Sequence, residues 1–238
     1  QFVFQEAQDA LNPRRSVGDL VVEGLLIHGK IRPGERDSKA KELFELVGID
    51  PNTIDRFPSQ FSSGQRQRIT IARALALQPK ILVLDEPVAS LDVSVQKEVV
   101  DLLLNLKEKF GLTYIIVSHD LALVKDIAHR IAVMYLGRIV EIAPSHVLIA
   151  NPLHPYTRAL ISAVPVPDPI KARSRQRIIL EGEIPSPSNI PTGCRFRTRC
   201  PYAKNLCAEE QPEIREASPD HFVACHYAEE IARKVQGK

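Results

Sequence analysis

The chain has 238 residues, 44% of them apolar, and a formal net charge of +2. This length predicts one large domain or two smaller ones with a sizeable core, and the near-neutral charge argues against an indiscriminate nucleic-acid binder. No apolar run approaches the roughly 18 to 20 residues that cross a bilayer, and no signal peptide opens the chain. We therefore expect neither secretion nor a membrane span.

Helical and strand patterns alternate along the first 150 residues. Asp37 is expected to cap a helix that stops at Gly48 and has an apolar face of Ala40, Leu43, Phe44 and Val47. Residues 81–84 and 113–117 are unbroken apolar or β-branched runs, which predict two buried parallel strands. Apolar residues at helical spacing over residues 95–110 predict a helix between them, ended by Gly111.

The pattern changes after the second strand. Residues 131–135 and 138–142 flank Leu136-Gly137, which is a hairpin signal. Together with the strand–helix–strand alternation, this favours an α/β sheet with a later antiparallel edge. Of the 18 Pro residues, 11 follow position 150, so we expect no long helices or central strands in the tail. A boundary is expected near Asn151, with a linker over residues 150–168.

Polar residues follow both predicted strands. Asp85 and Glu86 come directly after the first, where one carboxylate could hold a hydrated Mg²⁺ and the next could deprotonate an attacking water. His119 follows the second strand and could bind a terminal phosphate. The alternatives are a solvated acid pair and a structural histidine.

Small residues precede a helix predicted over residues 66–77. Ser62, Ser63, Gly64 and Gln65 would present free N–H groups and the positive end of the helix dipole, which suits a phosphate. An ordinary N-cap is the alternative. Residues 24–30 also fit the spacing of a phosphate-binding loop, but Ile31 stands where a hydroxyl should reach Mg²⁺, so we expect a helix end and a turn there.

All the cysteines fall in the last 45 residues, at Cys194, Cys200, Cys207 and Cys225. Four thiolates suit a tetrahedral zinc ion or an iron–sulfur cluster, and gaps wider than the usual zinc spacing favour the cluster. Free thiols, or disulfides formed in air, are the alternative.

Taken together, these segments resemble the ATP-binding-cassette (ABC) ATPases. Residues 61–68 resemble the signature motif, residues 81–87 the Walker B strand with its catalytic Glu, residues 89–92 the D-loop, His119 the switch His and residues 3–5 the Q-loop. Residues 151–160 and 193–201 resemble the oligopeptide/dipeptide permease ATPases. The implied fold is α/β: the C-terminal part of an ABC-type P-loop ATPase domain, with a helical subdomain and a parallel-sheet core, followed by a small Cys-containing C-terminal domain.

The resemblance implies a role for each matching residue. Glu86 would be the base and His119 would hold the γ-phosphate, while Asp85 and Gln5 would bind Mg²⁺ through water. The remaining nucleotide-binding residues are Ser62, Ser63, Gly64, Gln65 and Asp92. Of these, Ser62, Gly64 and Gln65 would close on the ATP of a partner subunit, and Asp92 would organise the seam of the dimer. Ser63 departs from the family, because the signature usually has Gly there and a Cβ crowds the approach to the phosphate. In some relatives the matching Cys tail holds a 4Fe–4S cluster.

The resemblance also implies a segment order. Residues 1–60 would hold the Q-loop and helical subdomain, residues 61–150 the signature, Walker B, D-loop and H-loop part of the core, residues 151–170 a linker, and residues 171–238 the Cys-rich domain. The family's Walker A loop would lie before Gln1, so we expect this chain to be a fragment that hydrolyses no ATP by itself.

The implied function is an ATP-binding and ATP-hydrolysing subunit that powers peptide import from the cytoplasmic face of the membrane. Its partners would be a second ATPase subunit, transmembrane permease subunits and, indirectly, a solute-binding protein. An importer of nickel or glutathione is the alternative within the family. A metal-binding nucleic-acid module is a further alternative, but the tail, with 12 Lys and Arg against 9 Asp and Glu over residues 171–238, has a net charge of only +3. A cassette ATPase of DNA repair is disfavoured because only 56 residues separate Gln5 from Ser62, too few for a long coiled coil.

Overall fold

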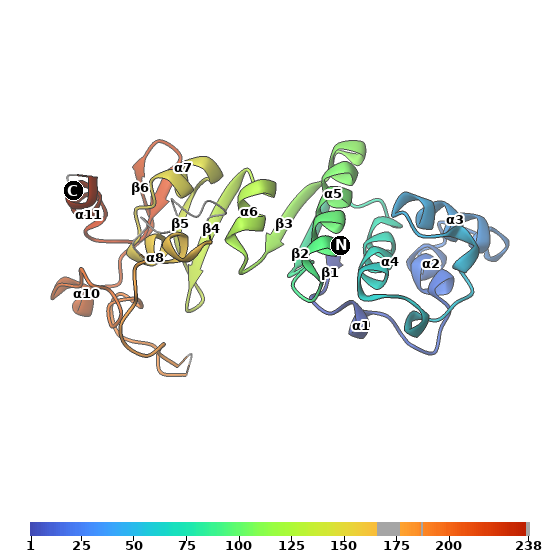
Figure 1. Ribbon diagram of the computed structural model, residues 1–238, viewed down its shortest axis with the longest axis horizontal. Helices are drawn as coiled ribbons and strands as arrows, with labels where there is room; N and C mark the ends of the chain where they lie inside the picture. The colour runs from blue at the N-terminus through green and yellow to red at the C-terminus, as the bar shows by residue number, and fades with distance from the viewer. Residues whose placement is uncertain (166–176, 187, 237–238) are drawn as a thin grey trace. The chain divides into compact units, whose positions relative to one another are not determined.

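The computed structural model describes residues 1–165, 177–186 and 188–236 (Figure 1). Contacts divide the chain into two compact units, Gln1–His119 and Asp120–Lys238. Residues 166–170 of the expected linker and 171–176 of the expected Cys-rich domain lie outside the described residues. The functional segments expected from the sequence stay predictions.

A three-stranded parallel sheet organises the first unit. Its strands are β1 (Phe2–Val3), β2 (Ile81–Asp85) and β3 (Thr113–Val117), in the order β1-β2-β3. The two strands expected from the sequence, β2 and β3, are confirmed and pair in parallel. The expected burial of β3 is wrong, because Ile115 and Val117 are 53% and 52% exposed on a strand that has only one neighbour among the described strands.

Helices make up most of the rest of the first unit. They are α1 (Ala7–Ala10), α2 (Val17–Ile27), α3 (Arg36–Leu46), α4 (Ser63–Leu75) and α5 (Val93–Phe110). The helix expected before Gly111 is confirmed as α5, and Gly111 ends it with φ of 62°. The expected cap of α3 is wrong: Glu35 is the N-cap residue, and Asp37 lies inside the first turn with its carboxylate on Arg36.

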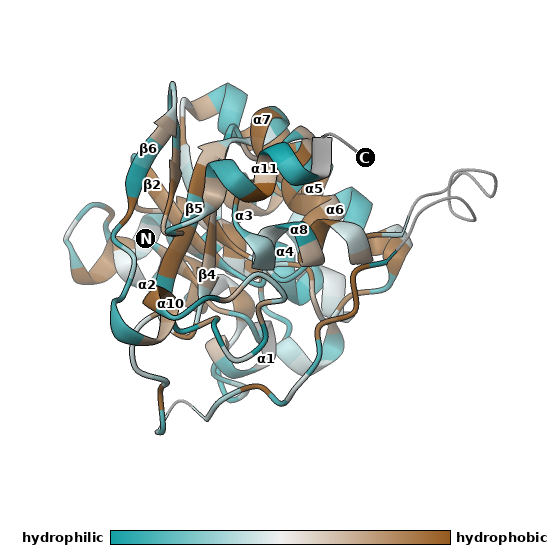
Figure 2. Ribbon diagram, turned by 90° about the vertical axis from the view of Figure 1, so that its left-hand side faces the viewer, coloured by the Kyte–Doolittle hydropathy of each residue, from teal (hydrophilic) through white to brown (hydrophobic). Residues whose placement is uncertain are grey.

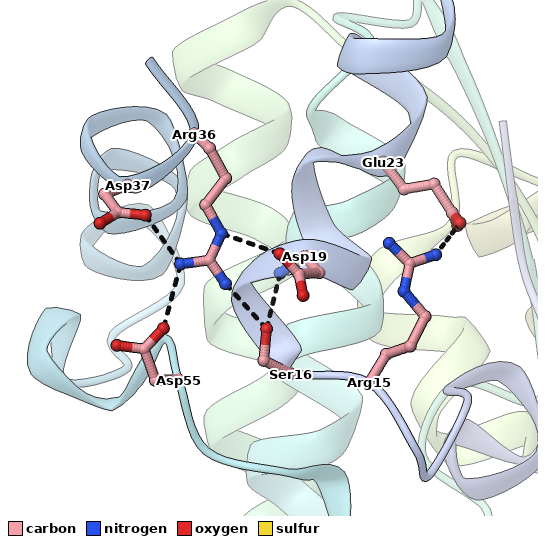
Figure 3. A network of polar contacts seen from close by, with 7 residues as sticks. All are labelled: Arg15, Ser16, Asp19, Glu23, Arg36, Asp37 and Asp55. Atoms are coloured by element: carbon pink, nitrogen blue, oxygen red, sulfur yellow. Dashed lines mark hydrogen bonds and ion pairs between the residues drawn. The ribbon is translucent and has the colours of Figure 1, made fainter. Parts of the chain in front are cut away.

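Arg36 joins the beginnings of α2 and α3 (Figure 3). Its guanidinium donates to Asp19 at 2.9 Å, to Asp37 at 2.7 Å, to Asp55 at 3.1 Å and to the Ser16 hydroxyl at 2.7 Å. Burial alone would raise the pKa of Asp19, but hydrogen bonds from Ser16 and Arg36 overcome it and hold that pKa below its ordinary value. The carboxylate therefore stabilises the fold above the pKa of an unfolded Asp, and this contribution is lost as the pH falls through the folded pKa.

A four-stranded antiparallel sheet organises the second unit. Its strands are β4 (Arg130–Tyr135), β5 (Arg138–Pro144), β6 (Arg215–Ser218) and β7 (His221–Val223), in the order β4-β5-β7-β6. The hairpin is confirmed, and Leu136 and Gly137 turn it with φ of 44° and 74°. Positive φ at both loop positions matches the right-handed twist of the strands.

Two expectations about this sheet are wrong. The hairpin does not form the edge of the parallel sheet, because β5 pairs with β7 in a separate sheet. The tail also supplies a central strand, since β7 lies between β5 and β6. No proline falls within residues 221–223, so this short stretch keeps the backbone N–H groups that a central strand needs.

Helices and an apolar cluster complete the second unit. The helices are α6 (Leu121–Ile127), α7 (Ser145–Ala150), α8 (Pro155–Ala163), α10 (Leu206–Glu209) and α11 (Ala228–Gln236). Strand β5 is largely hydrophobic (Figure 2), and Val140 packs in a buried cluster with Tyr135, Leu148 and Phe196. No helix in the described part of the chain is long and apolar enough to cross a membrane.

A buried carboxylate ties β5 to β7 and to the residues that lead into α8. Glu141 and His221 are both 0% exposed, and Glu141 Oε1 lies 2.7 Å from His221 Nε2. The same carboxylate accepts hydrogen bonds from the backbone N–H of Leu153 at 2.7 Å and of His154 at 2.9 Å. One side chain thus satisfies two backbone donors and a histidine that would otherwise be buried without these partners.

His154 is a structural residue of the same region. Its ring is 1% exposed, and burial lowers its pKa to about 3, which leaves it neutral. Nδ1 accepts a hydrogen bond from the Tyr156 N–H at 3.1 Å and so caps α8. The ring centroid lies 5.6 Å from that of Phe196, in the Cys-containing segment. Part of the motif over residues 151–160 therefore serves to hold this unit together.

Candidate functional site

The site residues of the first unit follow its three parallel strands. Gln5 comes two residues after β1, Asp85 is the last residue of β2 and precedes Glu86, and His119 comes two residues after β3. Because β1 pairs with β2 and β2 with β3 in parallel, these positions share the carboxyl edge of one sheet. Ligands of open α/β sheets bind at this edge.

The backbone at Glu86 turns its carboxylate toward the end of β3. Glu86 has φ of 45°, in the left-handed region, and its N–H donates to the Val117 carbonyl at 2.9 Å. Its Oε1 accepts a hydrogen bond from the His119 N–H at 3.1 Å and lies 2.7 Å from His119 Nδ1. A non-glycine residue in this region costs of order 1–3 kcal/mol, and such residues gather at functional sites.

The two side chains differ in their exposure to solvent. The Glu86 side chain is 15% exposed, whereas that of His119 is 78% exposed. A side-chain carboxylate can act as a general base, and an exposed imidazole can meet an anion from solvent. The structure thus brings together Glu86 and His119, which the sequence had singled out separately.

The residues before α4 form a local cap. The Ser62 hydroxyl accepts from the Gln65 N–H at 3.3 Å, and Gln65 Oε1 accepts from the Ser62 N–H at 3.0 Å. The helix begins at Ser63, earlier than the expected residue 66, because this reciprocal pair satisfies its first turn. The amides of Ser63 and Gly64 have no partner within the helix, as is usual in a first turn, so they can donate to an anion.

Gly64 has a packing reason that the sequence did not reveal. A Cβ at this position would lie 2.4 Å from Cγ1 of Val95, on α5. Real Cβ atoms essentially never come this close to another heavy atom, so a side chain at residue 64 would force Val95 or one of the two helices to shift. The residue thus serves the packing of this unit whether or not its amide binds phosphate.

The segment between β2 and α5 is fixed by a residue that sequence reasoning missed. Asp92 occupies the N-cap position of α5, but its side chain makes no capping hydrogen bond. Instead, Gln96 Nε2 donates to the carbonyls of Val88 at 3.1 Å and of Leu91 at 3.0 Å. The sequence signal that could have indicated this role was the amide side chain of Gln96, one turn after the start of the helix.

The apparent phosphate-binding loop is a helix end, as expected. Helix α2 runs to Ile27, and the N–H of Lys30 donates to the carbonyl of Leu25 at 2.8 Å. Gly29 has φ of 62° and reverses the chain. These bonds satisfy the last carbonyls of a helix, so the stretch makes no cradle for phosphate.

The four cysteines of the second unit line one small cavity of about 10 Å³. They are free thiols, and the Cys194 N–H donates to the Cys207 carbonyl at 2.8 Å. Burial raises the pKa of Cys200 to about 11 and that of Cys225 to about 12, so both are protonated at neutral pH. Within residues 1–165, 177–186 and 188–236, no three or more Cys, His, Asp or Glu side chains are arranged to hold a metal ion. The structure therefore does not support the predicted iron–sulfur cluster.

Two protein families match the chain. Residues 1–89 match the family described as ABC transporter, and residues 140–207 match the one described as oligopeptide/dipeptide transporter, C-terminal region. The first match holds Gln5, the α4 cap and the Asp85-Glu86 pair, and the second begins in β5 and ends at Cys207.

Curated relatives match nearly the whole chain. It is 50% identical to the oligopeptide transport ATP-binding protein AppF of Bacillus subtilis over 226 residues. These aligned residues make up 95% of this chain and 69% of AppF. It is 52% identical to a putative peptide import ATP-binding protein of Brucella ovis over 225 residues. These aligned residues make up 94% of this chain and 70% of that protein.

Solved cassette structures match a smaller part. A dimeric ATP-binding cassette, MJ0796, in a post-hydrolysis state bound to ADP and Pi, has a TM-score of 0.53 and 30% identity over 60% of this chain and 62% of that chain. The cbiO1 protein of Clostridium perfringens, part of the ABC transporter complex cbiONQ, has a TM-score of 0.56 and 30% identity over 63% of this chain and 58% of that one. The α/β cassette fold and the extent of the sequence identity agree, and the chain belongs to the ATP-binding proteins of the oligopeptide/dipeptide ABC transporters.

Proposed function

We propose that this chain belongs to the ATP-hydrolysing subunit of an importer of di- or oligopeptides. The observation that carries the proposal is the contact between Glu86 and His119 at the ends of adjacent parallel strands, 2.7 Å apart. Relatives that are 50% and 52% identical to this chain over the aligned residues are named for oligopeptide transport or peptide import. Hydrolysis of ATP would supply the energy for the transport.

In the proposed reaction, Glu86 is the general base. Its carboxylate takes the proton of the water that attacks the γ-phosphate, and His119 binds that phosphate with its exposed ring. Asp85 and Gln5 offer oxygen atoms at the same edge of the sheet, which fits the preference of Mg²⁺ for oxygen ligands and retained waters. When bound, Mg²⁺ neutralises charge on the phosphates.

We propose that the signature side acts on ATP held by a second ATPase subunit. The free amides of Ser63 and Gly64 would donate to the γ-phosphate, while the side chains of Ser62 and Gln65 keep the turn in place. Asp92 would lie at the seam between the subunits. The dimeric assembly named for the MJ0796 cassette supports this arrangement.

The other partners follow from the same proposal. Residues 6–60 would dock on transmembrane permease subunits, which places the protein peripherally on the cytoplasmic face of the membrane. A solute-binding protein would deliver the peptide to the permease. No nucleic-acid partner is proposed.

Uptake by the assembled transporter tests the substrate. With ATP on the side of the ATPase and the solute-binding protein on the other, labelled trialanine is expected to accumulate in proteoliposomes, because a peptide importer couples hydrolysis to this movement. The Glu86→Gln transporter is the control and should not accumulate it. If the proteoliposomes instead accumulate Ni²⁺ or glutathione, and added trialanine does not compete with that uptake, the importer would be assigned to one of those solutes.

A second part of the proposal concerns the cavity of the four thiols. The donor set suits a 4Fe–4S cluster or zinc, although the described thiols would have to rearrange to bind either one. Protein purified without air is expected to be brown, to absorb near about 400 nm and to contain about four irons per chain, as clusters of this type do. Colourless protein with one zinc per chain would decide for zinc, and colourless protein without metal would leave four free thiols.

A further inference from the structure

The second unit contains a cavity of about 800 Å³ that none of the proposed ATPase roles uses. One wall is the β4–β5 hairpin, with Met134 and Ile139, and another is the segment before β6, with Pro212 and Ile214. Phe196 also lines it. The volume lies within the range of small-molecule sites, which are mostly apolar with a few polar groups that orient the ligand.

Two guanidinium groups lie at the hairpin end of this cavity. The Arg138 side chain is exposed and makes no hydrogen bond or ion pair within the described part of the chain. Arg195 donates through Nη1 to the carbonyl of Leu136 in the hairpin loop, and its Nε is buried without a partner. Both guanidinium groups carry a positive charge, so this end of the cavity favours an anionic oxygen ligand. Arginines bind carboxylates especially well, because their donors match the two oxygens.

The segment before β6 contributes the opposite charge to the lining. Glu213 is exposed, lines the same cavity and has no ion pair or hydrogen bond among the residues that the structure describes. Gln211, next to Pro212, adds an amide with both a donor and an acceptor. The lining of the cavity therefore combines two cationic groups, a carboxylate and apolar side chains.

We propose that this cavity binds a short zwitterionic peptide with apolar side chains. The C-terminal carboxylate of the ligand lies at Arg138 and Arg195, its N-terminal ammonium at Glu213, and its side chains on Met134, Ile139 and Ile214. Both charges of the ligand are then paired. The site lies in the second unit and takes no part in ATP hydrolysis, so it goes beyond the proposed function.

Calorimetry with trileucine and the whole chain, without nucleotide, tests the proposal. Trileucine is expected to bind with one site per chain, and its N-acetylated and C-amidated forms are expected to bind at least about 10-fold more weakly, because each lacks one charged partner. These comparisons use the unaltered protein, so misfolding does not affect them. No binding of trileucine at about 10 mM, a weak-binding limit, would overturn the proposal, as would equal binding of the capped peptides.

Two variants assign the ends of the peptide. Arg138→Gln is expected to bind trileucine as weakly as the unaltered protein binds the amidated peptide, so this variant should bind trileucine and its amidated form with similar affinity. Glu213→Gln is expected to bind trileucine as weakly as the unaltered protein binds the acetylated peptide, and it should bind trileucine and its acetylated form with similar affinity. Arg177→Gln and Glu181→Gln are matched controls, since both residues are exposed and lie outside the cavity, and they should bind as the unaltered protein does. Variants at Arg138 and Glu213 that keep the full preference for both free ends would contradict the assignment.

Discussion

Glu86→Gln in the assembled transporter is expected to lower ATP turnover by about 10² to 10⁴-fold, the size of a general-base contribution. The amide keeps an oxygen that can accept from the His119 N–H, so the turn after β2 stays in place. It cannot take a proton from the attacking water. Steady-state phosphate release, measured at saturating ATP and Mg²⁺, gives the turnover.

The matched control is Glu108→Gln, on the exposed side of α5. It removes the same charge from the same unit, without touching the site, and is expected to leave the turnover unchanged. ATP binding by the Glu86 variant should also persist, because the change removes a proton acceptor and no phosphate contact. Near-normal turnover in the Glu86 variant would remove this residue from the role of base.

Glu141→Ala is expected to lower the free energy of unfolding of the second unit by about 3–5 kcal/mol. The change leaves the N–H groups of Leu153 and His154 and the ring of His221 buried without their acceptor. Amide hydrogen exchange at Leu153 and His154 measures the local stability, and urea unfolding followed by circular dichroism measures the whole.

Glu183→Ala is the control for that variant. Glu183 is exposed and makes no side-chain hydrogen bond or ion pair with other described residues, so its removal should change stability by less than about 0.5 kcal/mol. A Glu141 variant with unchanged exchange rates at the two amides would show that the buried carboxylate does not hold this region together.

Local patterns predicted the local elements. The apolar run of β2, the helical spacing of α5 with Gly111 after it, and the Leu136-Gly137 hairpin each depend on neighbouring residues, and each forms as expected. By contrast, the hairpin strand β5 and the tail strand β7 lie in one sheet because residues far apart in the sequence pair, such as Glu141 with Val223. Nothing in the local sequence of either strand specifies that partner.

The candidate site divides in the same way. Parallel strands predict that Glu86 and His119 share an edge, because residues after neighbouring strands must come close. The left-handed turn at Glu86, which aims the carboxylate at His119, could not be predicted, since nothing in residue type marks it. Likewise, the spacing of the cysteines suggested a metal site, but the distances between thiols depend on how the loops around Cys194 and Cys207 fold.

The central claim is that Glu86 and His119 form one hydrolytic unit at the ends of β2 and β3. Turnover of the assembled transporter, measured for Glu86→Gln, His119→Ala and the double variant, tests it most directly. Residues that act as a unit lose activity non-additively, so the double variant is expected to retain turnover within about threefold of the slower single variant. Losses that multiply in the double variant would show that the two residues act independently and would contradict the claim.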